Sequence, residues 1–397
     1  MNYHHGDVKE VRHIYLDYNA TTPVHPEVLE AFISFYRERF GNPSSIHWAG
    51  REVRGALENA RERVALLLNA DPVEVIFTSC GTEADNMAIK GVAAALRSRG
   101  NHIITSRTEH PAVVNSCVWL ESQGYEVTWL EPDANGAPDP AALEEAITDR
   151  TILISLMFAN HETGTILPVR EIGEIAARRK VYFHCDAVQA VGKVPVDFRG
   201  LNIGLLALSG HKIQAPKGVG ALLVRKGIKL APFIHGGPQE RNRRGGTENV
   251  AGIVALGKAC ELALAAMDSE SRRLTALRDK LEAGILATIA DVKVNGGSGV
   301  RLPHTSCLSF LNTEADSLLL NLDLLGIAAS SGSACSSGTL KASAVLLAMG
   351  VDPAFARGTV RFSLGRETTE ADIDYVLEVM PGIVARLRQG GRSESEI

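Results

Sequence analysis

Short apolar runs alternate with helix-forming segments through the middle of the chain, and this alternation restricts the possible folds more than any other feature. Runs of β-branched and aliphatic residues recur between positions 75 and 224, each separated from the next by a helical or turn-forming stretch. Strands that alternate with helices pair in parallel, and the helices cover both faces of the sheet. The sequence therefore predicts an α/β fold whose ligand site lies at the carboxyl ends of the strands.

The pattern changes after a long helical region from about Ala251 to Ile289. Beyond it we expect strands at 307–310 and 359–364 and helices at 315–325, near 342–349 and from residue 369 onward. This order is typical of a smaller α+β unit. We expect a large domain over residues 16–262 and a small domain formed by residues 1–15 and 263–397, because a chain of 397 residues is too long for one small core.

Composition excludes several classes of protein. The net charge is −5, aromatic residues make up only 5%, and basic residues form no long run, so we expect no nucleic-acid partner. The apolar runs of the strands are too short to cross a bilayer, and the N-terminus has no apolar signal region, which favours a cytoplasmic protein. The six cysteines form no Cys-x-x-Cys pair, so we expect free thiols and no metal site: Cys80, Cys117, Cys185, Cys260, Cys307 and Cys335.

One lysine lies at the end of a predicted strand. The motif Ser209-Gly210-His211-Lys212 follows the apolar run 205–208 and precedes a second apolar run at 219–224. Apolar surroundings lower the pKa of a lysine and make it a nucleophilic amine, which is what holding a cofactor aldehyde as a Schiff base requires. The alternative is an ordinary solvent-exposed loop lysine, which is what most loop lysines are.

A turn of small residues, Ser79 to Ala84, joins the strand at 75–78 to the next helix. Such a turn exposes backbone N–H groups at the positive end of a helix dipole and can bind a phosphate. A helix start capped by Thr82 fits the same residues equally well. Two further polar residues also have purely structural explanations. Asp186 could cap a helix, and Arg361 could be a solvent-exposed charge on a strand.

Cys335 differs from the other cysteines in its surroundings. Three Ser, two Gly and one Ala accompany it between Gly332 and Gly338. A thiol on a small, polar loop is accessible and reactive, whereas a core cysteine lies in an apolar stripe. We therefore expect a catalytic cysteine on a loop at about 328–340.

Several motifs together resemble the pyridoxal-phosphate enzymes of the cysteine desulfurase family (class-V aminotransferase superfamily), especially its NifS-type members. They occur in family order at positions 16–23, 41–45, 81–86, 108–110, 186–189, 209–212 and 331–335. The resemblance covers nearly the whole chain, from Tyr15 to about Ile373. It implies the fold type I of pyridoxal-phosphate transferases, with a mostly parallel seven-stranded sheet in the large domain, and a homodimer.

The resemblance also implies a role for each motif residue. Lys212 would hold pyridoxal 5'-phosphate and move protons at the substrate Cα, His110 would stack on the ring and transfer protons, and Asp186 would pair with the pyridine nitrogen. Further cofactor contacts are implied for Gly81, Thr82, His161, Gln189, Ser209, His211 and, from the partner subunit, Thr247. Substrate contacts are implied for Arg361 and Asn19.

The implied reaction converts L-cysteine to L-alanine and leaves a persulfide on Cys335. The sulfur would then pass to an acceptor or iron–sulfur scaffold protein. A selenocysteine lyase or an aminotransferase on the same fold is an alternative, and a non-catalytic sulfur carrier or scaffold is a third hypothesis. The chain departs from the family at His161, where an asparagine is usual, and the identity of the sulfur acceptor stays open.

Overall fold

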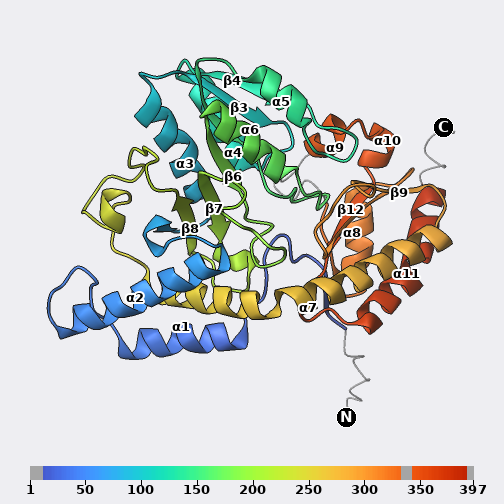
Figure 1. Cartoon of the computed structure of the whole chain (residues 1–397). Helices are drawn as coiled ribbons and strands as arrows, with labels where there is room; N and C mark the ends of the chain where they lie inside the picture. Colours follow the sequence, from blue (N-terminus) through green and yellow to red (C-terminus); the bar gives the residue numbers. More distant parts are fainter. Residues whose placement is uncertain (1–11, 332–341, 391–397) are drawn as a thin grey trace, which may run out of the picture.

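The largest element of the protein is a seven-stranded sheet with strand order β2-β8-β7-β6-β5-β3-β4. It is seen in a computed structural model that describes residues 12–331 and 342–390 (Figure 1). Only β8 runs antiparallel to its neighbours, so the predicted mostly parallel sheet is confirmed. The strands are β2 (Val75–Thr78), β3 (His102–Ser106), β4 (Glu126–Leu130), β5 (Thr151–Ser155), β6 (Tyr182–Asp186), β7 (Leu205–Ser209) and β8 (Gly220–Val224).

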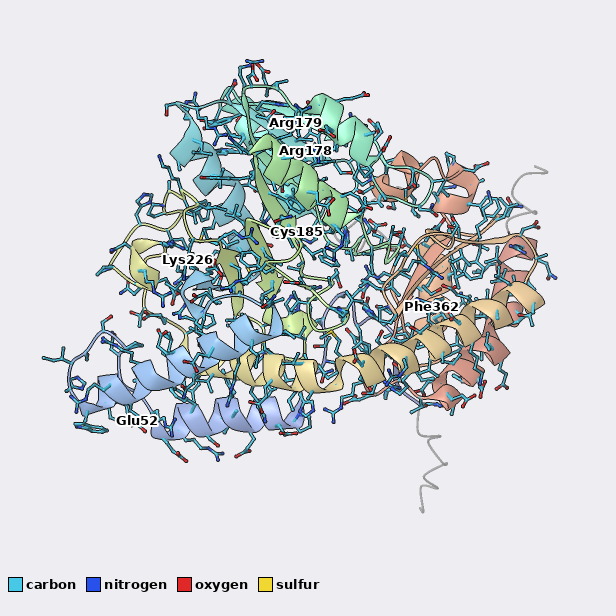
Figure 2. All side chains as sticks on the ribbon, in the orientation of Figure 1. Glu52, Arg178, Arg179, Cys185, Lys226 and Phe362 are labelled. Carbon is cyan, nitrogen blue, oxygen red and sulfur yellow. The ribbon has the colours of Figure 1, made fainter. Side chains whose placement is uncertain are left out.

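Helices cover both faces of this sheet. The helices are α1 (Pro26–Glu38), α2 (Trp48–Leu67), α3 (Gly81–Leu96), α4 (Pro111–Ser122), α5 (Pro140–Ala146), α6 (Val169–Arg179) and α7 (Val250–Thr288). Alternate residues of β6 point to opposite faces. Cys185 (labelled in Figure 2) and Phe183 are buried in the cluster that includes α2 and α6. His184 lies on the face of α3.

A second unit is built on a three-stranded antiparallel sheet of order β12-β10-β9. Its own apolar cluster includes Phe310 and Phe362 (Figure 2). The strands are β9 (Val292–Val294), β10 (Thr305–Phe310) and β12 (Thr359–Ser363), with a parallel pair β1 (Ile14–Tyr15) and β11 (Ile327–Ala328). The helices are α8 (Ala315–Asp323), α9 (Ala344–Ala348), α10 (Pro353–Ala356) and α11 (Glu370–Gly390).

Helix α7 connects the two units (Figure 1). Its N-terminal half, with Leu256 and Cys260, packs in the cluster of the large sheet, and its C-terminal half, with Leu281 and Ile285, packs in the second cluster. The predicted domain boundary between residues 262 and 263 falls inside this helix and stays a prediction. Most of the predicted cysteine loop, Cys335 included, lies outside the described residues.

By length and composition α7 also meets the criteria for a membrane-crossing helix, a possibility that the strand runs alone did not indicate. However, 56% of its most apolar window is buried inside the protein. The helix packs along α1, α2 and α11. Its apolar side chains are therefore accounted for by contacts within the fold.

Candidate active site

A cavity of about 200 Å³ opens at the carboxyl ends of the parallel strands. Five segments meet there: the start of α3, the start of α4, the loop after β5, the end of β6 and the end of β7. This is where an open α/β sheet binds ligands. Among the residues that line it are most of the predicted cofactor contacts: Gly81, Thr82, His110, His161, Asp186, Gln189, Ser209, His211 and Lys212.

Lys212 is positioned by a single helical turn, Gly210–Lys212, directly after β7. Its ammonium donates hydrogen bonds to the carbonyl oxygens of Asn19 and Ala20, the latter at 2.7 Å. The backbone of the turn is tied to the same segment, because the Thr22 hydroxyl donates to the His211 carbonyl at 2.9 Å. The predicted nucleophile is thus held at the junction of the large sheet and the N-terminal segment.

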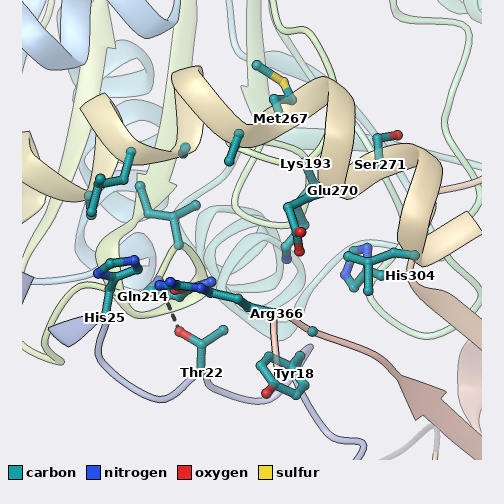
Figure 3. A pocket seen from close by; sticks show the side chains of 18 of the residues that line it. Tyr18, Thr22, His25, Lys193, Gln214, Met267, Glu270, Ser271, His304 and Arg366 are labelled. Atoms are coloured by element: carbon teal, nitrogen blue, oxygen red, sulfur yellow. Dashed lines mark hydrogen bonds between the residues drawn. The ribbon is translucent and has the colours of Figure 1, made fainter. Parts of the chain in front are cut away.

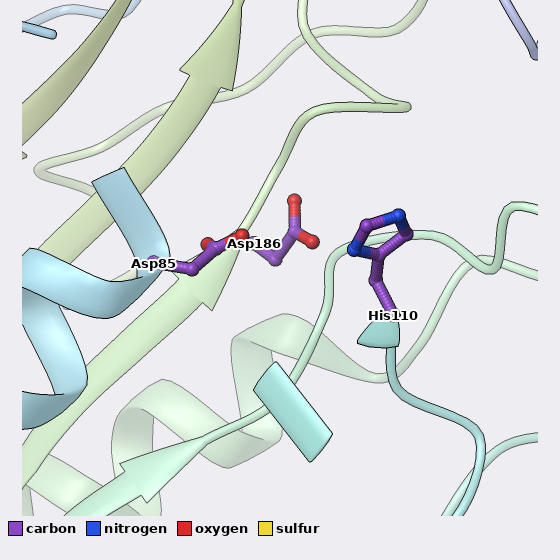
Figure 4. A group of neighbouring side chains, drawn as sticks. All are labelled: Asp85, His110 and Asp186. Carbon is purple, nitrogen blue, oxygen red and sulfur yellow. The ribbon is translucent and has the colours of Figure 1, made fainter. Parts of the chain in front are cut away.

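Asp186 ends β6 and is almost fully buried. One carboxylate oxygen accepts the backbone N–H of Val188 at 2.9 Å, but the chain after Asp186 forms a turn and not a helix, so the helix-cap alternative was wrong. Burial, together with the nearby carboxyl of Asp85, raises the pKa of Asp186 to about 6. Asp186 is ionised at neutral pH and can pair with a cation in the cavity. Figure 4 shows it between Asp85 and His110.

Two histidine rings meet above Asp186. His110 begins α4, and its Nδ1 accepts the backbone N–H of Ala112 at 3.1 Å, which leaves the ring proton of the neutral form on Nε2. The rings of His110 and His161 pack edge to face with centroids 5.4 Å apart. Burial lowers the pKa of both rings, so both are neutral at physiological pH. Nδ1 of His161 is buried and has no hydrogen-bond partner among the described residues.

The start of α3 is suited to an anion. The residue before the helix is Cys80, and no side chain of residues 12–331 or 342–390 caps the free backbone N–H groups, so the capping role considered for Thr82 is not observed. Beside it, the buried hydroxyl of Ser209 has no partner within the described chain. Uncapped N–H groups and a spare hydroxyl together provide donors for a phosphate.

Gly81, the first residue of α3, packs closely against Val188. A Cβ on Gly81 would lie 2.8 Å from Cγ2 of Val188, so a larger residue would have to displace that side chain. His211 lies nearby, and burial and the charge of Lys212 lower its pKa to about 4. A neutral His211 still donates through one ring nitrogen.

Gln189 lines the cavity and contacts Asn19 of the N-terminal segment. The Gln189 amide donates to the Asn19 carbonyl at 3.0 Å and accepts from Lys193 at 3.3 Å. The Asn19 side chain donates to the His161 carbonyl at 3.1 Å and accepts from His304 at 2.8 Å. Asn19 therefore holds the large sheet against the second unit, a structural task that the predicted substrate contact did not include.

Arg361 reaches the cavity region from β12. Its guanidinium donates to the His161 carbonyl at 3.0 Å and to Asp17 at 2.8 Å, and its side chain is 3% exposed. Its Nε is buried and has no hydrogen-bond partner among the described residues. This N–H is a donor to which a substrate carboxylate could bind. Arg361 is therefore not the solvated strand charge that was its alternative.

Thr247 is separate from the cavity. It is exposed and lines a small pocket beside Arg244 and Glu248. Within one chain it makes no contribution to the Lys212 cavity. This placement is compatible with, but does not test, the prediction that Thr247 serves the partner subunit.

A second, larger cavity of about 450 Å³ shares Lys212 with the first (Figure 3). It lies between α7 and the N-terminal segment and is lined by Tyr18, Lys193 and His304 among others. Burial, with the charges of Lys212 and Arg361, lowers the pKa of Lys193 to about 7.

Sequence reasoning did not identify a group of buried polar residues at the first cavity, one of which, Asp85, lines it. Asp85, Glu109 and His184 are each less than 5% exposed. Asp85 is a charged residue among small and apolar residues of α3, and this is the signal that could have identified it.

The residues of the first cavity fit pyridoxal phosphate. An amine, a buried carboxylate for a ring nitrogen, an aromatic ring above it and an uncapped helix start all face the same space. The unpartnered Ser209 hydroxyl and the close packing at Gly81 mark the phosphate end. Lys212, Asp186, His110 and Ser209 would hold the group.

Comparison with known proteins agrees with this arrangement. The aminotransferase class-V family model matches residues 14–376. Cysteine desulfurase IscS of Dictyoglomus turgidum is 52% identical over 95% of this chain and 96% of its own length. A solved NifS-like protein has a TM-score of 0.89 and 38% identity, covering 94% of this chain and all of that one. The solved SspA in complex with cysteine has a TM-score of 0.79 and 38% identity, covering 88% of this chain and 98% of that one. The chain belongs to the cysteine desulfurase family of class-V aminotransferases.

Proposed function

We propose that this protein is a pyridoxal-phosphate-dependent cysteine desulfurase that supplies sulfur for iron–sulfur cluster assembly. The observation that supports it most directly is the single cavity lined by both Lys212 and Asp186 at the strand ends. The relatives named above support L-cysteine as the substrate, since one is a cysteine desulfurase and another was solved with cysteine. We propose further that it works as a homodimer in the cytoplasm.

Some of these side chains bind the cofactor or the substrate, and one transfers a proton. When bound, pyridoxal phosphate supplies an electron sink that stabilises negative charge at the substrate Cα. Asp186 keeps the ring nitrogen protonated, and the α3 start with Ser209 orients the phosphate. Arg361 binds the substrate carboxylate through its free Nε–H. Lys212, released from the carbonyls of residues 19 and 20, moves the Cα proton.

Cys335 receives the sulfur in this proposal. Its thiolate attacks the sulfur of bound L-cysteine, the Cβ–S bond breaks, and a proton replaces sulfur on carbon to give L-alanine. The enzyme thiol becomes a persulfide, so atoms and electrons balance without an external oxidant. An acceptor thiol or a scaffold protein then removes the outer sulfur.

The test is Cys335→Ser, because a hydroxyl cannot hold a persulfide. We expect the variant to bind pyridoxal phosphate and to change its absorption on addition of L-cysteine, but to lose nearly all alanine formation and all protein-bound sulfane sulfur. Cys260→Ala and Cys307→Ala, at buried positions, are the matched controls and should remain active apart from packing costs. Parental alanine production by Cys335→Ser would contradict the sulfur-transfer mechanism, and a transaminated keto acid as product would indicate an aminotransferase.

A further inference from the structure

Asp85 lies on α3 and lines the cavity together with His110 and Asp186, and it is 1% exposed. Its Oδ1 is 3.4 Å from Nε2 of His184. Neither atom makes a well-directed hydrogen bond within the described part of the chain. A buried carboxyl in such a place must be either neutral or compensated by a positive charge.

His184 does not supply that charge. It lies on β6 two residues before Asp186, so both side chains face α3. Its Nδ1 is 2.9 Å from the hydroxyl of Ser155. Burial lowers the pKa of His184 to about 4, so the ring is neutral at physiological pH. With the Ser155 hydroxyl donating to Nδ1, the ring proton is on Nε2 and faces Asp85.

Three carboxyl groups, those of Asp85, Asp186 and Glu109, lie close to one another in this region. Atoms of Asp85, Asp186 and His110 lie within 4.8 Å of one another (Figure 4). Glu109 adds a third acid from the loop after β3, with one oxygen accepting the Met157 N–H at 2.8 Å and the other without a partner in the described chain. Burial raises the pKa of Asp85 to about 8 and that of Glu109 well above its usual range. Buried acids this close do not all ionise together.

We propose that Asp85 is a positioning residue for Asp186: held against His184, it remains a neutral acid, so that Asp186 carries the negative charge that faces the cavity. An ionised Asp85 would raise the cost of charging Asp186 and weaken the pairing with a ring nitrogen. The functional part rests on the proposed function, whereas the charge state of Asp85 can be tested in the protein without cofactor.

The first test compares the unfolding of the cofactor-free parent with that of Asp85→Asn. The pKa of Asp85 is raised above its unfolded value, so its stabilising effect is full at low pH and is lost as pH rises from about 4 through about 8. Asparagine mimics the neutral acid at every pH. We expect the ratio of unfolding constants, parent over variant, to increase at least about tenfold between pH 5.5 and 8.5.

The exposed Asp268→Asn, also in a helix, is the control and should show no such change. Asp85→Ser is a second neutral variant if asparagine impairs folding. A pH-independent ratio for the neutral variants would overturn the proposal. So would stabilisation of the parent by added Zn²⁺ or Mg²⁺ that Asp85→Asn abolishes, because the acid would then be a charged metal ligand.

The second test measures pyridoxal-phosphate affinity and the absorption band of the bound cofactor. Asp85→Asn should keep the parental affinity within about threefold and the same band, whereas Asp186→Asn should lose at least about tenfold and shift the band. If Asp85→Asn behaves like Asp186→Asn, Asp85 is itself the charged partner and the proposal is wrong. If the parent binds no pyridoxal phosphate, the proposed function fails, while the first test still decides the charge of Asp85.

Discussion

Arg361 illustrates how a single side chain can build a site and also be the proposed contact for its substrate. Two of its nitrogens are engaged by Asp17 and the His161 carbonyl, and Nε remains for a ligand. Arg361→Lys keeps the charge but loses the planar fork. We expect KM for L-cysteine to rise about 10- to 100-fold, corresponding to about 1.4–2.8 kcal/mol, with a smaller change in kcat.

The measurement is steady-state alanine release over a range of L-cysteine concentrations. Arg357→Lys is the matched control, since Arg357 is exposed and pairs with Glu314 away from the cavity. An unchanged KM in Arg361→Lys would show that the substrate carboxylate binds elsewhere.

The sequence allowed some residues to be assigned and not others, for a physical reason. Lys212 and Asp186 follow apolar runs, and strand ends converge at one edge of a parallel sheet. The tasks of Asn19 and Asp85 depend on contacts with residues far along the chain, such as His304 and His184. Such contacts leave no periodic signal in a single sequence.

At the scale of elements, the junction of β7 with the start of α3 is the proposed phosphate site. The Ser209 hydroxyl has no partner in the described protein, so removing it costs no internal hydrogen bond. We expect Ser209→Ala to leave thermal stability unchanged and to weaken pyridoxal-phosphate binding about 10- to 100-fold, the loss of one hydrogen bond to a charged group. Equilibrium titration of the cofactor-free protein measures this.

Ser306→Ala supplies the comparison, because Ser306 is also a buried serine without a partner among the described residues, but lies on β10. It should bind the cofactor as the parent does. Equal affinities for Ser209→Ala and the parent would place the phosphate elsewhere.

The elements themselves were predicted with unequal success. Strand β2 occupies the predicted residues, and α7 differs from its prediction by one residue at each end. The start of α3 is earlier than predicted, because the turn residues from Gly81 onward are already helical. The short strands β9 and β11 were missed, since runs of two or three residues carry no measurable alternation.

At the scale of the whole molecule, one chain does not bring all the predicted cofactor contacts together. Thr247 lines a pocket distinct from the Lys212 cavity, although the family resemblance assigns it to the cofactor phosphate. Both statements hold if Thr247 reaches the cavity of a second subunit. The sequence could not separate these cases, because a composite site between two chains and a site within one chain require the same residues.

Mixing two inactive or weakened variants distinguishes a site shared between two chains from a site within one chain. Lys212→Ala cannot attach the cofactor covalently, and Thr247→Ala should release it faster than the parent does. In a mixed dimer, the Lys212 of the Thr247→Ala chain is paired with the intact Thr247 of the other chain, so one site is fully parental. Refolding the two variants together should therefore restore slow cofactor release at about one quarter of all sites, as random pairing of equal amounts dictates. Release is followed by the loss of the bound absorption band on dilution into a cofactor trap. If Thr247 serves its own chain, every attached cofactor in the mixture is released at the fast rate of Thr247→Ala, and the shared-site proposal is wrong.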